Sequence, residues 1–353
     1  MSYTNGLDKS SDYFNTVLYT GNSTDNHTIS VGFQPDFTWI KDRGRSGFNH
    51  RLQNSVAGAT ESLQSNRTVS TQTNSDAVKS FNSNGFVLGN DAGNGSFNGS
   101  STFVAWNWLA GGSASSNSNG SITSSVSANT TSGFSIVSYT GTGSASTIGH
   151  GLGSAPKMVI CKTRSTAGVW LTWHTGIPIN GQIQLQSTDA VYNPGTGLYW
   201  NSTLPTSSVF SVGTSGSVNG SGTTYIAYCF AEKKGFSKFG SYTGNGNADG
   251  TFVYTGFKPA FVLVKATSIS GESWQLNDTK RKTFNVNSTS LFPNLSNAES
   301  STAMYVDMLS NGFKIRGTDG GVNQSGGTLI YIAFAENSFV ANDSGTAVPG
   351  TAR

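Results

Sequence analysis

The sequence predicts an all-β fold made of three tandem antiparallel β-sandwich repeats of the jelly-roll or lectin-like type. Landmark motifs recur three times at matched spacing, short apolar runs alternate with turn residues, and no segment keeps a helical period. The 353 residues include 44 glycines and 11% aromatic residues, which suits short strands joined by polar turns. Because disordered chains are poor in aromatic residues, this composition also argues against disorder.

Four landmarks define the repeat. They are Tyr-Thr-Gly (19–21, 139–141, 242–244), an apolar run ending in Lys (Lys41, Lys162, Lys265), a turn with Phe and Gly (84–89, 208–213, 311–317) and a terminal apolar strand (102–110, 224–232, 328–336). The first Gly precedes the Lys by 20, 21 and 21 residues, and the Lys precedes the Phe of the third landmark by 45, 48 and 48. Intervals matched this closely predict three copies of one unit.

The landmarks also predict the limits of the units. We expect β repeats at 15–112, 133–234 and 235–339, with an N-terminal arm at 1–14 and a C-terminal arm at 340–353. Residues 113–132, between the first two repeats, are rich in Ser and Gly. That composition predicts a flexible linker.

The second and fourth landmarks read as strands. A proline precedes each apolar run of the second landmark, where its missing N–H is tolerated, and the fourth is apolar on both faces, as in a central strand. Residues 51–63 are expected to form one or two turns of helix. Cys161 and Cys229 fall in these strands and are expected to be small buried side chains. A disulfide between them stays open, although a cytosolic origin disfavours it.

Charge and hydropathy exclude several classes of function. Lysines and arginines are scattered and the net charge is +3, so we expect no nucleic-acid partner. The first residues lack the apolar run of a secretory signal, and no stretch has the length of a membrane-spanning helix. We therefore expect synthesis in a cytosol and no membrane insertion.

Catalytic and metal-binding patterns are weak. None of the four histidines belongs to a recognisable nucleophile or zinc pattern, and no phosphate-binding loop occurs. We expect no enzymatic activity and no cofactor. Loops 90–94 and 244–250 offer oxygen atoms for calcium but lack EF-hand spacing, and the same residues dominate ordinary turns, so no metal site is predicted.

A shallow glycan site is the sharper binding hypothesis, because such sites combine aromatic rings with amides and carboxylates. The same residues also suit a sandwich core or a subunit interface. The candidate residues are Trp170, Trp173, Tyr199, Trp200, Asn201, Trp274, Asn277 and Asp278.

Several runs resemble a repeat domain of virion proteins from tailed bacteriophages, common in phages of marine bacteria and cyanobacteria. They are Gly-Phe-Gln-Pro-Asp-Phe-Thr-Trp-Ile-Lys (32–41), Thr-Ser-Ser-Val-Phe-Ser-Val-Gly (206–213), Tyr-Ile-Ala-Tyr-Cys-Phe-Ala-Glu (225–232) and Lys-Phe-Gly-Ser-Tyr-Thr-Gly-Asn-Gly (238–246). Members are usually described as tail-fibre-like or structural. The resemblance implies a lectin-like sandwich on the virion exterior and brings no catalytic residues.

The resemblance leads to three functional hypotheses. The first is a tail fibre or spike-associated component that contributes to host-surface attachment. The second is a capsid decoration (cement) protein, whose terminal arms would contact shell subunits, and the third is a polysaccharide depolymerase. The expected partners are further copies of the chain in a homotrimer, other virion structural proteins and a host-surface glycan.

Overall fold

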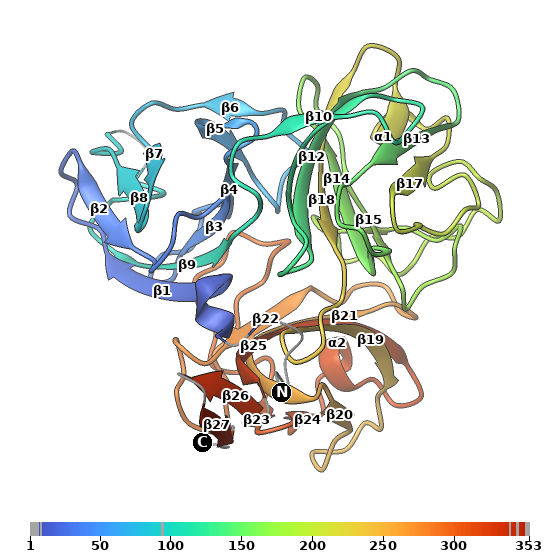
Figure 1. The fold of residues 1–353 in the computed structure, drawn as a ribbon. Helices are drawn as coiled ribbons and strands as arrows, with labels where there is room; N and C mark the ends of the chain where they lie inside the picture. Colours follow the sequence, from blue (N-terminus) through green and yellow to red (C-terminus); the bar gives the residue numbers. More distant parts are fainter. Residues whose placement is uncertain (1–6, 8, 93–94, 339, 344–345, 350–353) are drawn as a thin grey trace.

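The fold consists almost entirely of antiparallel β-sheets, which confirms the predicted all-β, sandwich-like class. The computed structural model describes residues 7, 9–92, 95–338, 340–343 and 346–349. Strands make up 43% and helices 3% of the structure. Three lobes, formed by successive segments of the chain, surround a common centre (Figure 1). We call residues 9–112, 113–234 and 235–338 the first, middle and last segments.

The first segment forms a six-stranded sheet, β1-β9-β3-β4-β5-β6, with a smaller sheet, β2-β8-β7, over its outer face. The short helix η1 (Ser10–Asp12) precedes these strands. Their bounds are Phe14–Thr20 (β1), His27–Ser30 (β2), Phe37–Asp42 (β3), Arg51–Asn54 (β4), Gly58–Leu63 (β5), Gln72–Thr73 (β6), Val78–Asn82 (β7), Gly85–Leu88 (β8) and Thr102–Trp108 (β9). The helical turn predicted over residues 51–63 is wrong. These residues form the β4–β5 hairpin, which pairs Leu52 with Leu63 and buries both side chains.

The middle segment forms a seven-stranded sheet, β10-β11-β12-β18-β14-β15-β16, accompanied by the pair β13-β17 and the helix α1 (Gly216–Asn219). The bounds are Ser115–Asn117 (β10), Ser124–Asn129 (β11), Phe134–Thr140 (β12), Ser146–Gly149 (β13), Met158–Thr163 (β14), Trp170–His174 (β15), Ile183–Gln184 (β16), Val209–Val212 (β17) and Thr224–Phe230 (β18).

The last segment forms a four-stranded sheet, β19-β25-β21-β22, with the sheet β20-β24-β23 and the helix α2 (Gly320–Asn323). The bounds are Ser237–Thr243 (β19), Phe252–Tyr254 (β20), Phe257–Ala266 (β21), Gln275–Asp278 (β22), Val306–Leu309 (β23), Gly312–Ile315 (β24) and Thr328–Ser338 (β25).

The three inner sheets share one order and one register. The strands follow one another as β1-β9-β3-β4, β12-β18-β14-β15 and β19-β25-β21-β22. The second-landmark strand pairs with the terminal strand in the same way each time. The pairs are Phe37 with Trp108, Met158 with Phe230 and Phe261 with Phe334. The three segments therefore have the same strand order and pairing, and their division into repeats of one unit stays a prediction.

Residues 113–132 do not form the flexible linker that their composition predicts. Strands β10 and β11 lie there, and β11 pairs with β12 along five residues. Val126 is buried, so the segment contributes both hydrogen bonds and apolar contact to the middle sheet. Ile122, Ser124 and Ser127 are buried as well, while most of the remaining positions are exposed or half-buried.

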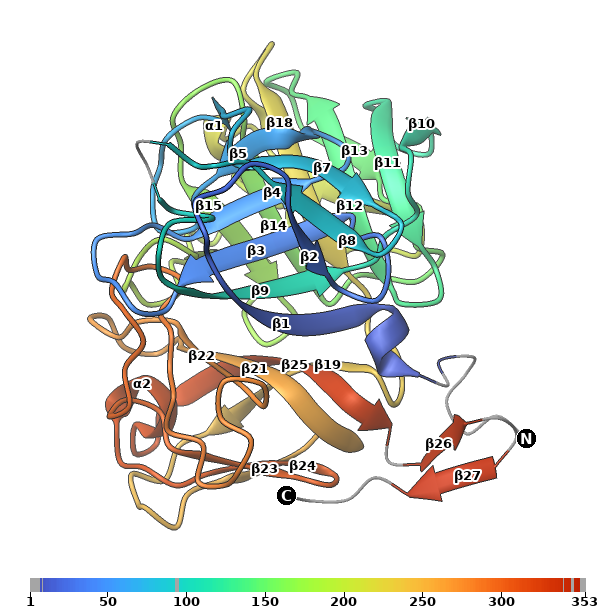
Figure 2. The same ribbon diagram turned by 90° about the vertical axis from the view of Figure 1, so that its left-hand side faces the viewer.

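The two predicted arms are only partly described. Residues 1–6, 8, 339, 344–345 and 350–353 lie outside the described residues, so contacts of the arms with a shell stay a prediction. Phe14, at the end of the predicted N-terminal arm, already belongs to β1 and is buried. In the C-terminal arm, β26 (Val340–Asp343) and β27 (Thr346–Pro349) form a hairpin that lies at the side of the last segment (Figure 2).

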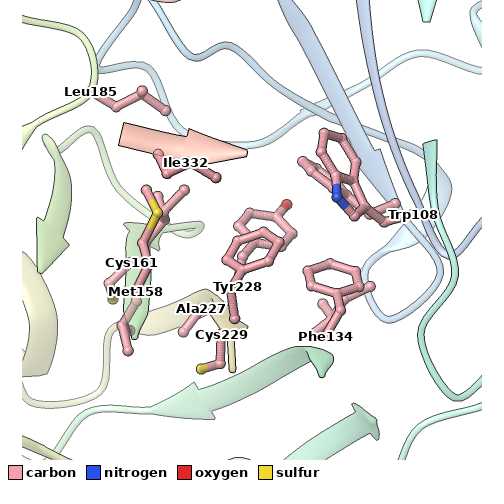
Figure 3. Close-up of a cluster of buried hydrophobic side chains, with 14 of the residues drawn as sticks. Trp108, Phe134, Met158, Cys161, Leu185, Ala227, Tyr228, Cys229 and Ile332 are labelled. Atoms are coloured by element: carbon pink, nitrogen blue, oxygen red, sulfur yellow. The ribbon is translucent and has the colours of Figure 1, made fainter. Parts of the chain in front are cut away.

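One apolar core joins the three segments. The faces of the inner sheets that point away from their covers meet at the centre, where aromatic and aliphatic side chains fill the space (Figure 3). Ring contacts close the circle between segments: Phe37 with Tyr228 at 4.4 Å, Phe230 with Phe334 at 6.0 Å and Phe334 with Phe14 at 5.1 Å. A void of about 30 Å³ remains, lined by apolar residues of all three segments. The segments therefore share a core and are not independent domains.

A buried asparagine explains the Tyr-Thr-Gly landmark. Asn98, Asn219 and Asn323 precede the three terminal strands and are fully buried. The landmark tyrosine donates to the carbonyl of the residue before each asparagine: Tyr19 to Phe97 (2.7 Å), Tyr139 to Val218 (2.7 Å) and Tyr242 to Val322 (2.6 Å). The landmark glycine leaves room for the backbone of the residue that follows each asparagine. A Cβ added at Gly141 would lie 2.5 Å from the carbonyl oxygen of Gly220.

Candidate functional site

Burial removes most of the predicted glycan residues from the surface. The four tryptophans are at most 4% exposed, and Asn277 and Asp278 are fully buried. A ring must expose a face in order to stack on a sugar, so the predicted site is wrong for these six residues. Tyr199 is half-buried and Asn201 is exposed. These two residues do not come together with Trp274 in a common cleft.

Two of the tryptophans join neighbouring segments. The Trp170 Nε1 of the middle segment donates to the carbonyl of Gln64 in the first segment at 2.8 Å. The Trp274 Nε1 of the last segment donates to the carbonyl of Gln184 in the middle segment at 3.0 Å. Each indole therefore buries a large apolar surface and satisfies its polar atom across a junction. These two tryptophans therefore belong to the core, which was the alternative interpretation of the candidate glycan residues.

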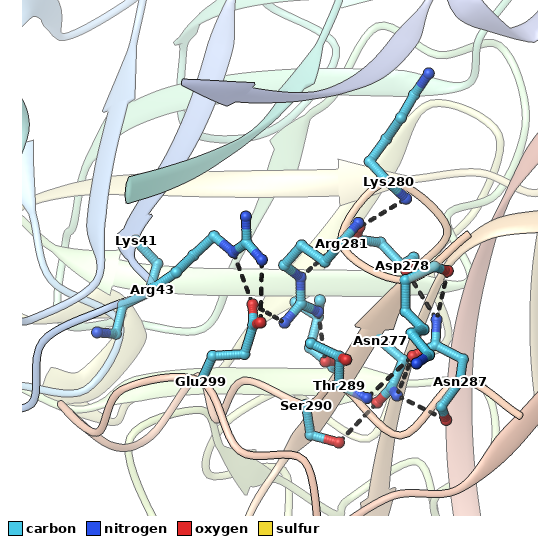
Figure 4. A network of polar contacts seen from close by, with 12 residues as sticks. Lys41, Arg43, Asn277, Asp278, Lys280, Arg281, Asn287, Thr289, Ser290 and Glu299 are labelled. Atoms are coloured by element: carbon cyan, nitrogen blue, oxygen red, sulfur yellow. Dashed lines mark hydrogen bonds and ion pairs between the residues drawn. The ribbon is translucent and has the colours of Figure 1, made fainter. Parts of the chain in front are cut away.

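Asn277 and Asp278 belong to a buried polar network between the last and first segments (Figure 4). Asp278 accepts from the Nε of Arg281 at 2.5 Å and from the Nε1 of Trp106 in the first segment at 3.0 Å. Asn277 donates to the Oδ1 of Asn287 at 3.1 Å. Both side chains already have partners for the groups that would bind a sugar.

Glu299 completes this network at its outer edge. Its carboxylate accepts from the Nε and Nη2 of Arg43 at 2.8 and 3.0 Å, and the Nη1 of Arg281 lies 3.4 Å away. The Glu299 carboxylate raises the pKa of Arg43 further above its usual value. This bidentate pair links the first and last segments, which are far apart in sequence.

The three landmark lysines are buried at the ends of β3, β14 and β21. Their ammonium groups bind backbone carbonyls, and two of them reach the preceding segment. Lys162 donates to Thr68 at 3.3 Å and Lys265 to Thr188 at 3.2 Å, while Lys41 donates to Asp42 at 2.7 Å. Burial lowers the pKa of each lysine to about 8. These lysines place three positive charges at one end of the shared core.

Three of the four histidines and both cysteines lie in the interior. His50, His150 and His174 are buried, and burial lowers the pKa of His174 to about 4. Cys161 and Cys229 are buried free thiols, which confirms their predicted place in the core and leaves them unbonded. Burial raises the pKa of the Cys161 thiol to about 12. A protonated, inaccessible thiol is a poor nucleophile.

The two loops that offer oxygen atoms for calcium differ in what the structure describes. In loop 244–250, Asp249 pairs with the Nζ of Lys314 at 2.5 Å, so its carboxylate forms an ion pair between this loop and β24. In loop 90–94, residues 93–94 lie outside the described residues. Within the described part of the chain, no group of three or more His, Cys, Asp or Glu side chains could hold a metal ion.

Sequence reasoning missed two sets of amide side chains. The first is the buried asparagine of each segment, which a recurring motif could have revealed. It occurs as Phe97-Asn98-Gly99-Ser100, Val218-Asn219-Gly220-Ser221 and Val322-Asn323-Gln324-Ser325. The second set comprises Asn66, Gln186 and Asn294, which line one cavity between the segments. Their irregular spacing left no signal in the sequence.

The chain belongs to the DUF7483 family, which is described as a domain of unknown function. The family model matches residues 9–338, so a single family domain spans all three segments and their common core. No curated protein matches the chain. No solved structure matches it either. Among the described residues, no helix is long and apolar enough to cross a membrane.

Proposed function

We propose that this protein is a bacteriophage virion structural protein on the particle exterior, where it serves as a tail fibre or spike-associated component. The observation that best supports the proposal is the single core shared by three sheets. Interlocked segments open together rather than one at a time, which suits a part exposed to solvent and to a host surface. Charged residues make up only 11% of the chain, so salt weakens few of its contacts.

Host-surface attachment would rest on exposed aromatic residues. Tyr192 is 53% exposed, and its ring packs edge to face against Tyr199 at 6.4 Å. Asn201 is exposed on the same stretch of chain. We therefore propose that a glycan contacts Tyr192, Tyr199 and Asn201 and not the buried tryptophans. These three residues offer two aromatic rings and a side-chain amide.

Location on the particle is the first test. Antibodies raised against the purified protein would be applied to intact phage and imaged by electron microscopy. Labelling of the tail or its fibres supports the proposal. Labelling confined to the capsid would indicate a decoration protein instead. If intact particles are not labelled and the protein is also missing from disrupted particles, a structural role is contradicted.

Attachment is tested with the full chain. Purified protein should compete with phage for adsorption to host cells, and Tyr192→Ala should weaken that competition. Tyr254→Ala is the matched control, because Tyr254 is 63% exposed but lies on β20 of the last segment. Equal competition by both variants would contradict the proposed contact. Sedimentation of the same preparation tests the proposed homotrimer.

A further inference from the structure

A cavity of about 460 Å³ lies where the three segments meet. The first segment contributes four residues to its wall, the middle segment one and the last segment four. They are Asn49, Asn66, Arg67, Thr68, Gln186, Asn294, Leu295, Ser296 and Asn297. Amide groups dominate this wall and it contains one cation and no carboxylate. No single segment could form it alone.

Three of the amides are held in the same way. In each segment a backbone N–H at the start of an equivalent strand donates to the oxygen of one amide side chain. The bonds run from His50 to Asn66 Oδ1 (3.2 Å), from Trp170 to Gln186 Oε1 (2.8 Å) and from Trp274 to Asn294 Oδ1 (3.0 Å). Trp170 is the first residue of β15, and His50 and Trp274 directly precede β4 and β22; these are the fourth strands of the shared order.

This arrangement determines which end of each amide is nitrogen. A backbone N–H only donates, so the side-chain atom that it meets must be the oxygen. The NH2 group then lies on the other side and carries two protons. One proton of each is used, by Asn49 Oδ1 (2.7 Å), Gln184 Oε1 (2.5 Å) and Ser273 Oγ (3.2 Å). The second proton of each NH2 remains as a donor for a ligand.

Positive charge reinforces these donors. The Arg67 side chain lines the cavity and the residue is exposed. Behind the wall, the ammonium group of Lys162 donates to the carbonyl of Thr68, so a buried cation lies one peptide group from the cavity. Because the lining contains no carboxylate, N–H donors and positive potential favour an anion.

We propose that this cavity binds an oxyanion, that is, a carboxylate, sulfate or phosphate group. The guanidinium of Arg67 supplies a planar pair of donors for two oxygens, and the amides of Asn66, Gln186 and Asn294 supply donors from the three segments. A free ion and an acidic saccharide both present these oxygens, and the three probes below distinguish the two sources. The proposal does not depend on where the protein sits on a particle.

The test measures the thermal unfolding midpoint of the full chain against added ligand at constant ionic strength, balanced with chloride. Inorganic phosphate, sulfate and an oligogalacturonate are the three probes. We expect at least one to raise the midpoint saturably, because a ligand that binds only the native state stabilises it. A rise with phosphate or sulfate alone indicates a free ion, and a rise with oligogalacturonate indicates a saccharide carboxylate.

Two variants connect the effect to the cavity. Arg67→Gln should weaken binding at least tenfold. Asn294→Asp keeps the oxygen that accepts from Trp274 but replaces the NH2 donor with negative charge, so it should abolish binding. Arg316→Gln, on an exposed arginine of the last segment, is the control and should bind as the wild type does. The proposal is overturned if no probe acts saturably, or if Arg67→Gln and Asn294→Asp both bind as the wild type does.

Discussion

Replacing Asn219 with alanine should cost the protein about 3–5 kcal/mol of stability. The buried Asn219 accepts from the N–H of Thr142 at 2.8 Å and donates to the carbonyls of Gly213 at 2.8 Å and Ser144 at 2.6 Å. Gly213 is buried, so its carbonyl would lose its partner at a cost of about 1–3 kcal/mol. Thr142 and Ser144 are exposed, so water can bind the groups that lose Asn219. The net loss for each of these two bonds is then about 1 kcal/mol.

Urea unfolding followed by tryptophan fluorescence measures this loss, with Asn119→Ala at an exposed turn as the control. The shared core predicts that Asn219→Ala lowers the midpoint of one transition for the whole chain, without separating a transition of the middle segment. Asn219→Asp should lose at least as much at neutral pH, because a carboxylate oxygen would face two carbonyls. A loss no larger than that of the control, or a separate early transition, would refute the reasoning.

Three further predictions concern charge and access. Burial lowers the pKa of Lys162 to about 8, so the native protein binds this proton less tightly than the unfolded chain and gains stability as pH rises from about 8 towards 10.5. Relative to Lys162→Met, wild type should therefore gain about 2–3 kcal/mol across that interval in unfolding titrations; a constant difference contradicts this. Glu299→Gln should cost about 1–2 kcal/mol, and a double-mutant cycle with Arg43→Ala should show coupling, whereas additive losses would not fit the bidentate pair. Cys161 and Cys229 should react with a thiol reagent only at the rate of unfolding; rapid labelling of the native protein would contradict their burial.

Strands could be predicted where the pattern was local. The apolar runs ending in Lys41, Lys162 and Lys265 are strands, because their apolar residues act within a few positions. Pro35 and Pro156 precede their strands as expected, whereas Pro259 lies inside β21 at a shift in register. The β4–β5 hairpin was missed, since the spacing of Leu52 and Leu63 also suits a helix face. Pairing between the two strands makes this segment a hairpin and not a helix, and the local pattern of residues does not encode that pairing.

The candidate site failed for a different reason. Aromatic and amide residues gather both in glycan sites and in polar junctions between sheets, and composition alone does not distinguish them. Trp170 and Trp274 are buried by segments whose contacting residues lie about 90 or more positions away, as shown by their bonds to Gln64 and Gln184. Burial of this kind depends on how the three sheets meet, which no single stretch of sequence contains.

The central layers show why the three segments differ although their backbones pair alike. One layer combines Trp39 with Ile160 and Leu263, which occupy the same place in the register of their strands. A second combines Trp106 with Tyr228 and Ile332. A symmetric trimer of one unit would place three identical side chains in each layer, so three copies of the first segment would overfill both layers with tryptophan. Interiors tolerate redistribution of volume better than its increase. Joining the units in one chain lets large and small side chains share a layer. No unit can then take the place of another, because the layers would be overfilled or left with space.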